Sequence, residues 1–187
     1  MAISKLDLNT ALVVVDLQKG IVAFPTAHPI KPVIKCASRL AAAFRQHGLP
    51  VVLVNVAGGA PGRTEQNRQL GNLPEDWADL IPELEQRSTD HTVTKRTWGA
   101  FTHSDLATWL KSRDVTQLVL AGVATSIGVE STARDAYELG FNVTLAIDAM
   151  TDISAEAHDN SVQRIFPRLG ETGSTDDVIA QLDLRVA

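Results

Sequence analysis

The chain has 187 residues, a length typical of one domain, and 44% of them are hydrophobic. That composition predicts a packed globule rather than a disordered chain. The formal net charge is −5 and there is no long run of Lys or Arg, which argues against a protein that binds nucleic acid through a basic face. We therefore expect a single domain over residues 1–187 with no nucleic-acid partner.

Cysteine usage and the N-terminal sequence indicate the cellular compartment. Cys36 is the one cysteine and cannot form an internal disulfide, which favours a cytoplasmic protein. The segment MAISKLDLNT lacks the basic and apolar regions of a signal peptide. No apolar stretch approaches the ~20 residues that span a bilayer. We expect a cytoplasmic protein without membrane contact.

Short apolar runs typical of β-strands alternate along the chain with segments at helical spacing. Strands are predicted at residues 11–15, 50–56, 91–95, 117–123, 142–147 and about 168–172. Helices are predicted up to Gly48, from Ser104 to Leu110, from Ile127 to Leu139, from Ser154 to about Phe166, and from Ser174 onward. Residues 57–91 are polar and rich in Gly and Pro, which predicts a long excursion that serves as a lid or a partner surface.

The alternation of strands and helices predicts an α/β protein. Its sheet is expected to be mostly parallel, with about six strands and helices on both faces, as in a three-layer α/β/α sandwich. Right-handed crossovers place the functional loops of such a sheet at the carboxyl ends of the strands. Candidate functional residues are therefore sought where strands end.

The first candidate is Asp16, which follows the apolar run from Leu12 to Val15. A carboxylate at this point lies at the rim of the expected crevice. Burial there raises its pKa, and a nearby cation lowers it. The alternative is an Asp that begins a turn and caps the next segment.

The second candidate is Lys95, which ends another predicted strand in the segment VTKRTWGAF. Of two adjacent strand residues, here Lys95 and Arg96, one points to one face of the sheet and the other to the opposite face. The alternative for Lys95 is a solvated charge at a strand edge. Trp98 and Phe101 follow, and each could line a pocket or pack in the core or an interface.

The third candidate is GVATSIGVESTARDA, residues 122–136, which leaves a strand and opens a helix. Free backbone N–H groups at a helix start can stabilise an oxyanion or bind a carboxylate. The alternative is an ordinary turn capped by Thr125 or Ser126. The glycine spacing does not match a loop that cradles phosphates, which argues against a P-loop or a dinucleotide site. Arg134 and Asp135 are predicted to form a structural ion pair or a subunit contact.

Together, VVVDLQ, the K-x-x-x-G-A-F pattern of Lys95–Phe101 and GVATSIGVESTARDA resemble the isochorismatase-like hydrolase family. That family includes cysteine hydrolases such as nicotinamidases and N-carbamoylsarcosine amidohydrolase. The resemblance covers nearly the whole chain and implies a Rossmann-like parallel sheet. In the cysteine members an Asp, a Lys and a Cys form the catalytic set, and these positions match Asp16, Lys95 and Gly128. Glycine offers no nucleophile, and Cys36 is expected to be an inert core thiol in a helix far from the motif.

One branch of this family carries glycine in place of the cysteine. Its members, the isochorismatases and the phenazine-pathway hydrolases, cleave a vinyl ether without a covalent intermediate. The resemblance implies that Asp16 acts as a general acid toward the enol carbon. It also implies that Lys95 and the start of the helix hold a small anionic substrate, such as isochorismate, and orient water.

Two departures from that branch keep other functions open. Ala124 and Ser126 stand where the vinyl-ether hydrolases carry Tyr and His, and the stretch after Gly128 is more similar to the cysteine hydrolases. An amide or imide hydrolase with an altered or lost nucleophile is therefore one alternative. A noncatalytic binding or assembly module on the same fold is another.

The resemblance carries further expectations for the site and its partners. It implies that the peptide joining Val123 and Ala124 is cis and, together with Thr125 and Ser126, lies in an oxyanion or substrate site. It also implies a homo-oligomer, a dimer or larger, and no cofactor. The Asp-x-His pattern of the metal-binding nicotinamidases is absent from residues 57–91, and the histidines form no close pair in the sequence, so we predict no metal. The five histidines are His28, His47, His91, His103 and His158.

Overall fold

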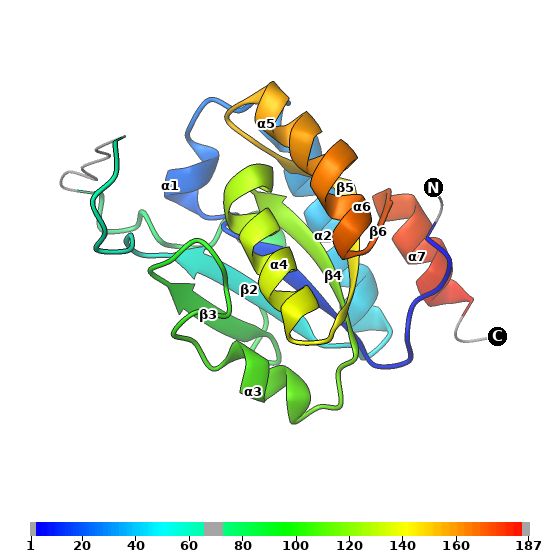
Figure 1. The fold of residues 1–187 in the computed structure, drawn as a ribbon. Helices are drawn as coiled ribbons and strands as arrows, with labels where there is room; N and C mark the ends of the chain where they lie inside the picture. Colours follow the sequence, from blue (N-terminus) through cyan, green and yellow to red (C-terminus); the bar gives the residue numbers. More distant parts are fainter. Residues whose placement is uncertain (1–2, 66–72, 185–187) are drawn as a thin grey trace.

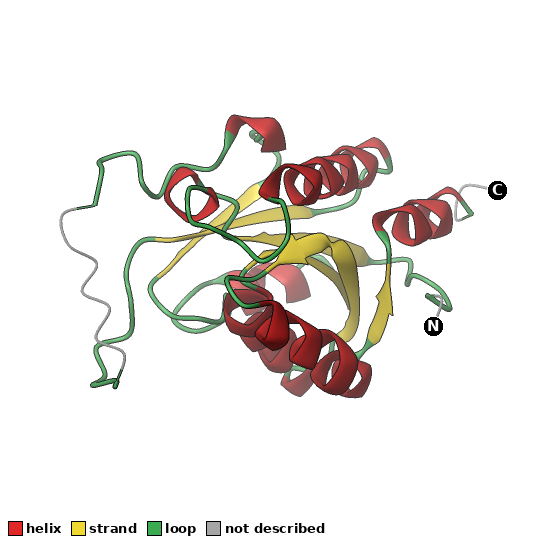
Figure 2. Ribbon diagram, turned by 90° about the horizontal axis from the view of Figure 1, so that it is seen from above, coloured by secondary structure: helices red, strands yellow, loops and turns green. Residues whose placement is uncertain are grey.

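The computed structural model describes residues 3–65 and 73–184, which form a sheet covered by helices on both faces (Figure 1, Figure 2). The strands are β1 (Thr10–Val15), β2 (Val51–Val56), β3 (His91–Lys95), β4 (Gln117–Val123), β5 (Asn142–Thr151) and β6 (Glu171–Gly173). The sheet has six strands in the order β3-β2-β1-β4-β5-β6, and every pairing is parallel. This arrangement confirms the predicted three-layer α/β/α sandwich.

Alternate residues of the central strand β1 pack into two apolar clusters, one on each face of the sheet. Leu12 and Val14 pack in one apolar cluster with α2 (Ile30–Gln46) and α7 (Thr175–Asp183). Val13 and Val15 pack in a second cluster with α3 (Leu106–Lys111), α4 (Glu130–Glu138) and α6 (Phe166–Leu169). All six β1 residues are buried, as expected for a parallel strand with helices on both sides.

The direction in which successive strands are added to the sheet reverses between β3 and β4, on either side of β1. The chain moves outward from β1 to β2 and β3, then returns to place β4 on the other side of β1. In open parallel sheets, ligands bind at the carboxyl ends of the two strands that flank such a switch point. Asp16 follows β1 and residues 124–128 follow β4, so the topology brings two of the three candidate segments to this point.

Local sequence signals account for the ends of several helices. Gly48, with φ of +66°, follows the C-terminal end of α2. Ser174 and Asp177 form a reciprocal capping box at the start of α7. The Ser154 side chain accepts the Ala157 N–H at the start of α5 (Ala155–Asn160). These signals were correctly interpreted as helix boundaries.

The structure differs from the predicted elements in several places. The short helix α1 (Lys19–Val22) was not predicted. The predicted helix from Ile127 begins as a wider helical turn, Thr125–Val129, before α4. A similar turn, Ser161–Ile165, joins α5 to α6. The fifth strand continues to Thr151 and the sixth begins at Glu171, because the apolar pattern marks the buried middle of a strand better than its ends.

The excursion at 57–91 divides into two parts. Residues 73–90 include a single short helical turn, Pro82–Leu84, and bury Trp77, Ile81 and Leu84. That stretch therefore belongs to the packed body rather than to a free lid. Residues 66–72 lie outside the described residues, so the prediction of a lid or partner surface remains untested there. No helix within 3–65 and 73–184 combines the length and apolar character needed to cross a bilayer.

Candidate active site

Asp16 and Lys95 form a buried ion pair at the carboxyl ends of β1 and β3. Lys95 Nζ donates to Asp16 Oδ2 at 2.7 Å and to the Thr97 carbonyl at 3.2 Å. Asp16 is 5% exposed and Lys95 3% exposed. The alternative of a solvated strand-edge lysine is therefore wrong. Arg96, the neighbour of Lys95, is exposed as the strand alternation predicted.

The second carboxylate oxygen of Asp16 has no protein partner. Among the described residues, Asp16 Oδ1 is buried and accepts no hydrogen bond. Burial raises the pKa of Asp16 to about 6, although the charge and hydrogen bond of Lys95 act in the opposite direction. A carboxyl group with this pKa exchanges a proton near neutral pH, as a general acid or base requires.

The turn that follows β4 brings Gly128 against Asp16. A Cβ atom at position 128 would lie 3.2 Å from Asp16 Oδ2 and 3.0 Å from Val15 Cγ1. The Gly128 carbonyl accepts the Thr132 hydroxyl at 2.7 Å, which ties the turn to α4. The structure therefore brings together the three positions that the sequence interpretation linked: Asp16, Lys95 and Gly128.

The peptide between Val123 and Ala124 is cis, as the family resemblance implied. Neither Thr125 nor Ser126 caps the following helical turn with its side chain, so that alternative is wrong. Thr125 is fully buried, and its hydroxyl bonds the His158 ring. The backbone N–H of Ser126 is instead bound by a carboxylate from another strand.

That carboxylate belongs to Asp152, a residue that the sequence interpretation missed. Asp152 Oδ2 accepts the Ser126 N–H at 2.7 Å, and Oδ1 accepts the N–H groups of Ile153 at 2.8 Å and Ser154 at 3.2 Å. Asp152 is 1% exposed. Its position directly after a buried strand is the same signal that singled out Asp16, but the strand was predicted to end too early.

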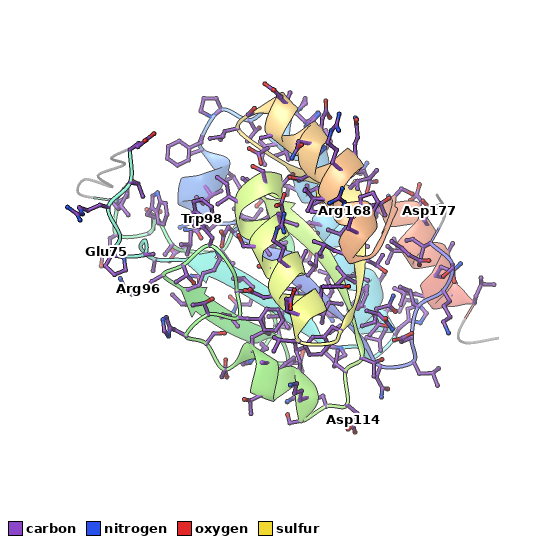
Figure 3. The ribbon with its side chains drawn as sticks, in the orientation of Figure 1. Glu75, Arg96, Trp98, Asp114, Arg168 and Asp177 are labelled. Carbon is purple, nitrogen blue, oxygen red and sulfur yellow. The ribbon has the colours of Figure 1, made fainter. Side chains whose placement is uncertain are left out.

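The aromatic candidates lie in different environments. Figure 3 shows Trp98 and Arg96 at the same end of the sheet, opposite the end marked by Asp114. Trp98 is 65% exposed. Phe101 stacks on Phe141, with ring centroids 6.1 Å apart, within the second apolar cluster. Phe101 is thus partly buried and packs against the core, and its place in a substrate pocket stays a prediction.

Arg134 and Cys36 both differ from their predicted roles. Arg134 pairs with Glu130 at 2.8 Å rather than with Asp135. Cys36 lies on α2, as predicted, but it is partly exposed rather than a core thiol. Its Sγ is 3.6 Å from Asp148 Oδ2.

The histidines differ from the sequence interpretation in one respect. The rings of His28 and His158 are in edge-to-face contact, with centroids 4.6 Å apart, although 130 positions separate them in the numbering. Within the described residues, no three His, Cys, Asp or Glu side chains gather closely enough to hold a metal ion.

Comparison with known proteins places these residues in a family. A model of the isochorismatase domain matches residues 10–177. The isochorismatase family protein YwoC of Bacillus subtilis is 42% identical over 93% of this chain and 94% of its own length. An isochorismatase family protein of known structure from Burkholderia thailandensis is 39% identical, with a TM-score of 0.93 over 97% of this chain and 100% of that chain.

More distant relatives carry names that state an activity or a pathway. The ureidoacrylate amidohydrolase RutB of Pseudomonas syringae is 28% identical over 90% of this chain and 82% of its own length. The phenazine biosynthesis protein PhzD1 of Pseudomonas aeruginosa is 29% identical over 67% of this chain and 66% of its own length. The domain match, together with the fold shared along almost the full chain, shows that this chain belongs to the isochorismatase family of hydrolases.

Proposed function

We propose that this chain hydrolyses a small anionic vinyl ether, such as isochorismate, with Asp16 as the general acid and without a covalent intermediate. The observation that carries the proposal is the state of Asp16. Its Oδ1 is buried without a partner in the described part of the chain, its Oδ2 is held by Lys95 at 2.7 Å, and burial raises its pKa to about 6. Gly128 beside it offers no side-chain nucleophile.

The reaction balances with water as the one co-reactant. Protonated Asp16 transfers its proton to the methylene carbon of the enol ether, and the C=C electron pair forms the new C–H bond. The cation that results is shared by the ether carbon and oxygen. Water adds to that carbon and loses a proton, which returns to Asp16. In the hemiketal, the bond between the former enol-ether carbon and the bridging oxygen then breaks, and the hydroxyl proton passes to that oxygen, which releases pyruvate and a diol.

The remaining residues of the site would bind charge and position the substrate. Lys95 supplies a buried positive charge for a substrate carboxylate, and its contact with Asp16 fixes where that charge lies. The 125–129 turn begins a helical segment, whose partial positive charge favours a nearby anion, while its Ser126 N–H is already bound by Asp152. A general acid in such a site typically contributes about 10²–10⁴-fold to the rate.

A second candidate is an amide hydrolase. The similarity to RutB and the sequence after Gly128 favour it. Because no thiol is present at position 128, water would have to attack the carbonyl directly. Ionised Asp16 would then remove the proton from that water as a general base, with the oxyanion stabilised by the turn that follows β4.

The experiment is a substrate screen with wild-type protein and Asp16→Asn. Pyruvate release from isochorismate, measured by coupling to lactate dehydrogenase, is expected for the wild type and is expected to fall at least about 10²-fold in Asp16→Asn. Equal turnover by both proteins would contradict the acid role.

Two other outcomes of the screen point elsewhere. Release of ammonia from a panel of small amides and ureides, without pyruvate, would replace the leading proposal by the amide hydrolase. Turnover of neither class, with tight binding of a carboxylate ligand by calorimetry, would favour the noncatalytic binding module.

A further inference from the structure

A set of side chains outside the candidate site makes contact with the turn that carries Gly128. Thr125 Oγ1 lies 2.8 Å from His158 Nδ1 on α5. The His158 ring contacts the His28 ring edge-on. Thr151 Oγ1 lies 3.2 Å from His28 Nδ1 and accepts the His28 backbone N–H at 3.2 Å. We call these four residues the histidine network.

Three residues of the histidine network are buried and His28 is exposed, and the network connects distant segments of the chain. Thr125 and Thr151 are fully buried, and His158 is 9% exposed. Loss of the imidazole would leave the Thr125 hydroxyl buried without this partner, which is unfavourable. The contact also attaches the turn to α5, while Asp152 attaches it to the end of β5. The position of the turn relative to Asp16 therefore depends on two side chains from outside it.

We propose that His158 is a positioning residue that acts through Thr125 to hold the 124–128 turn at its distance from Asp16. The proposal rests on the proposed role of Asp16, since the turn faces that carboxylate. A displacement of about 1 Å in a reacting group can reduce a rate by about 10²-fold. His158 would affect the reaction by this route without touching the substrate.

The electrostatic surroundings of His158 support the proposal. Burial lowers the pKa of His158 and the neighbouring His28 lowers it further, whereas Asp159 and Asp152 raise it. Both histidines and Asp148 line a cavity of about 210 Å³, so Asp148 is a further charge near the pair. Glu130, at the start of α4, is bonded to Ser161 on the turn that follows α5.

Protonation of His158 changes the bond on which the turn depends. Neutral imidazole can accept the Thr125 hydroxyl proton at Nδ1, whereas imidazolium can only donate there. The Thr125 hydroxyl must then turn its proton away, next to a second histidine ring. We therefore expect the conformation of the turn to change with pH. The midpoint of that change should equal the pKa of His158, which lies below 6.5.

The first test needs no substrate. NMR spectra of protein labelled with [15N]histidine give the tautomer of the His158 ring and the midpoint of its titration. The His158 signal is assigned by its loss in His158→Asn. Protein labelled with [15N]glycine gives the Gly128 amide signal, assigned in Gly128→Ala. Both are measured in Asp16→Asn, which removes the titration of the neighbouring carboxyl group.

The expected result is that the Gly128 amide titrates with the same midpoint as the His158 ring. That titration should vanish in the Asp16→Asn, Thr125→Val double variant, which keeps the shape of the side chain but lacks the hydroxyl. It should return in Asp16→Asn, Thr125→Ser. A Gly128 signal that does not titrate, or that titrates equally with Val at position 125, would overturn the proposal.

The second test is kinetic and uses whichever substrate the screen identifies. Thr125→Val and His158→Leu are each expected to lower kcat about 10–10²-fold with a change in KM below about threefold. The double variant should be no slower than the slower single variant, because both break one contact. Thr125→Ser should recover most of the rate, and the surface change His103→Asn should leave it unchanged.

The two tests separate the two proposals. If His158 has a purely structural role, each variant should lose folded protein in proportion to its loss of rate. Thermal unfolding measures the loss of folded protein directly. Rate losses that multiply in the double variant would contradict action through Thr125. If wild-type protein hydrolyses none of the substrates, the proposed function fails, while the Gly128 titration still decides whether His158 controls the turn.

Discussion

Gly128 lies so close to Asp16 that a Cβ atom at position 128 would stand 3.2 Å from Asp16 Oδ2. A thiol at that position in the cysteine hydrolases would thus share its surroundings with the Asp–Lys pair. In this chain the same space adjoins a carboxyl group whose pKa is raised to about 6 by burial. The carboxyl group that we propose as the proton donor therefore lies directly beside a position without a side chain.

The pH dependence of the rate should distinguish the two candidate reactions. If Asp16 is a general acid, it must be protonated, so kcat/KM should be highest below pH 6 and fall up to about tenfold per pH unit above it. If Asp16 is a general base, kcat/KM should rise through the same range. The measurement is kcat/KM from pH 4.5 to 8 in buffers of constant ionic strength. A profile that is flat from pH 5 to 7 would contradict both roles.

The same carboxyl group should make folding stability depend on pH. Its pKa is about 6 in the folded protein and near 3.8 in the unfolded chain, so the folded state binds more protons between these values. Stability from this group is full below pH 3.8 and is lost as the pH rises to 6. Relative to Asp16→Asn, the wild type should lose up to about 3 kcal/mol across this window.

Urea unfolding at intervals of half a pH unit checks this expectation. The difference between wild type and Asp16→Asn cancels the contributions of other titrating groups. The exposed residue Asp114 provides a matched control, because Asp114→Asn should track the wild type at every pH. A constant difference between wild type and Asp16→Asn would show that burial does not raise this pKa.

Gly128→Cys should introduce a reactive thiol next to Asp16 and Lys95. The new Cβ would lie 3.0 Å from Val15 Cγ1, so a side chain must move by a few tenths of an ångström, and we expect a loss of about 1 kcal/mol in stability. In a Cys36→Ser background, iodoacetamide should modify one site, which peptide mapping assigns to position 128. Folded protein without labelling at that position would mean that the turn is closed to small electrophiles.

Asp152→Ala should destabilise the protein without touching the Asp16–Lys95 pair. The change removes a buried acceptor from the N–H groups of Ser126, Ile153 and Ser154. Ser126 is half-buried, whereas Ile153 and Ser154 are exposed and can bond water, so we expect a total loss of about 1–3 kcal/mol and a lower unfolding temperature. The exposed neighbour Asp159 is the control, and Asp159→Asn should unfold near the wild-type temperature. An unchanged midpoint in Asp152→Ala would show that water replaces the carboxylate.

The sequence predicted the sheet well because its signals are local. Strands β1, β2, β4 and β5 each contain an apolar run, and their alternation with helices predicts parallel pairing, although the order of the strands was not predicted. Asp16 and Lys95 could be singled out because each lies at the end of a predicted strand. The motif resemblance then linked them to Gly128, and the structure brings the three together.

The contacts around the turn could not be predicted in this way. Asp152 reaches Ser126 across 26 positions and His158 reaches Thr125 across 33. Neither spacing has a period or a motif, because the contacts depend on how far β5 runs and on where α5 packs. His28 and His158 looked unrelated for the same reason. Contacts between separate elements are fixed by tertiary packing, which a single sequence encodes only indirectly.

The side chain of Gln18, two residues after Asp16, anchors the segment that follows β2. Its amide accepts the Val56 N–H at 2.7 Å and donates to the carbonyls of Val56 at 3.0 Å and Trp77 at 3.1 Å. One buried side chain therefore holds both ends of the segment between β2 and Trp77. Because the ends are clamped together, lengthening the segment adds little closure entropy. Insertions there should leave the backbone at Asp16 in register.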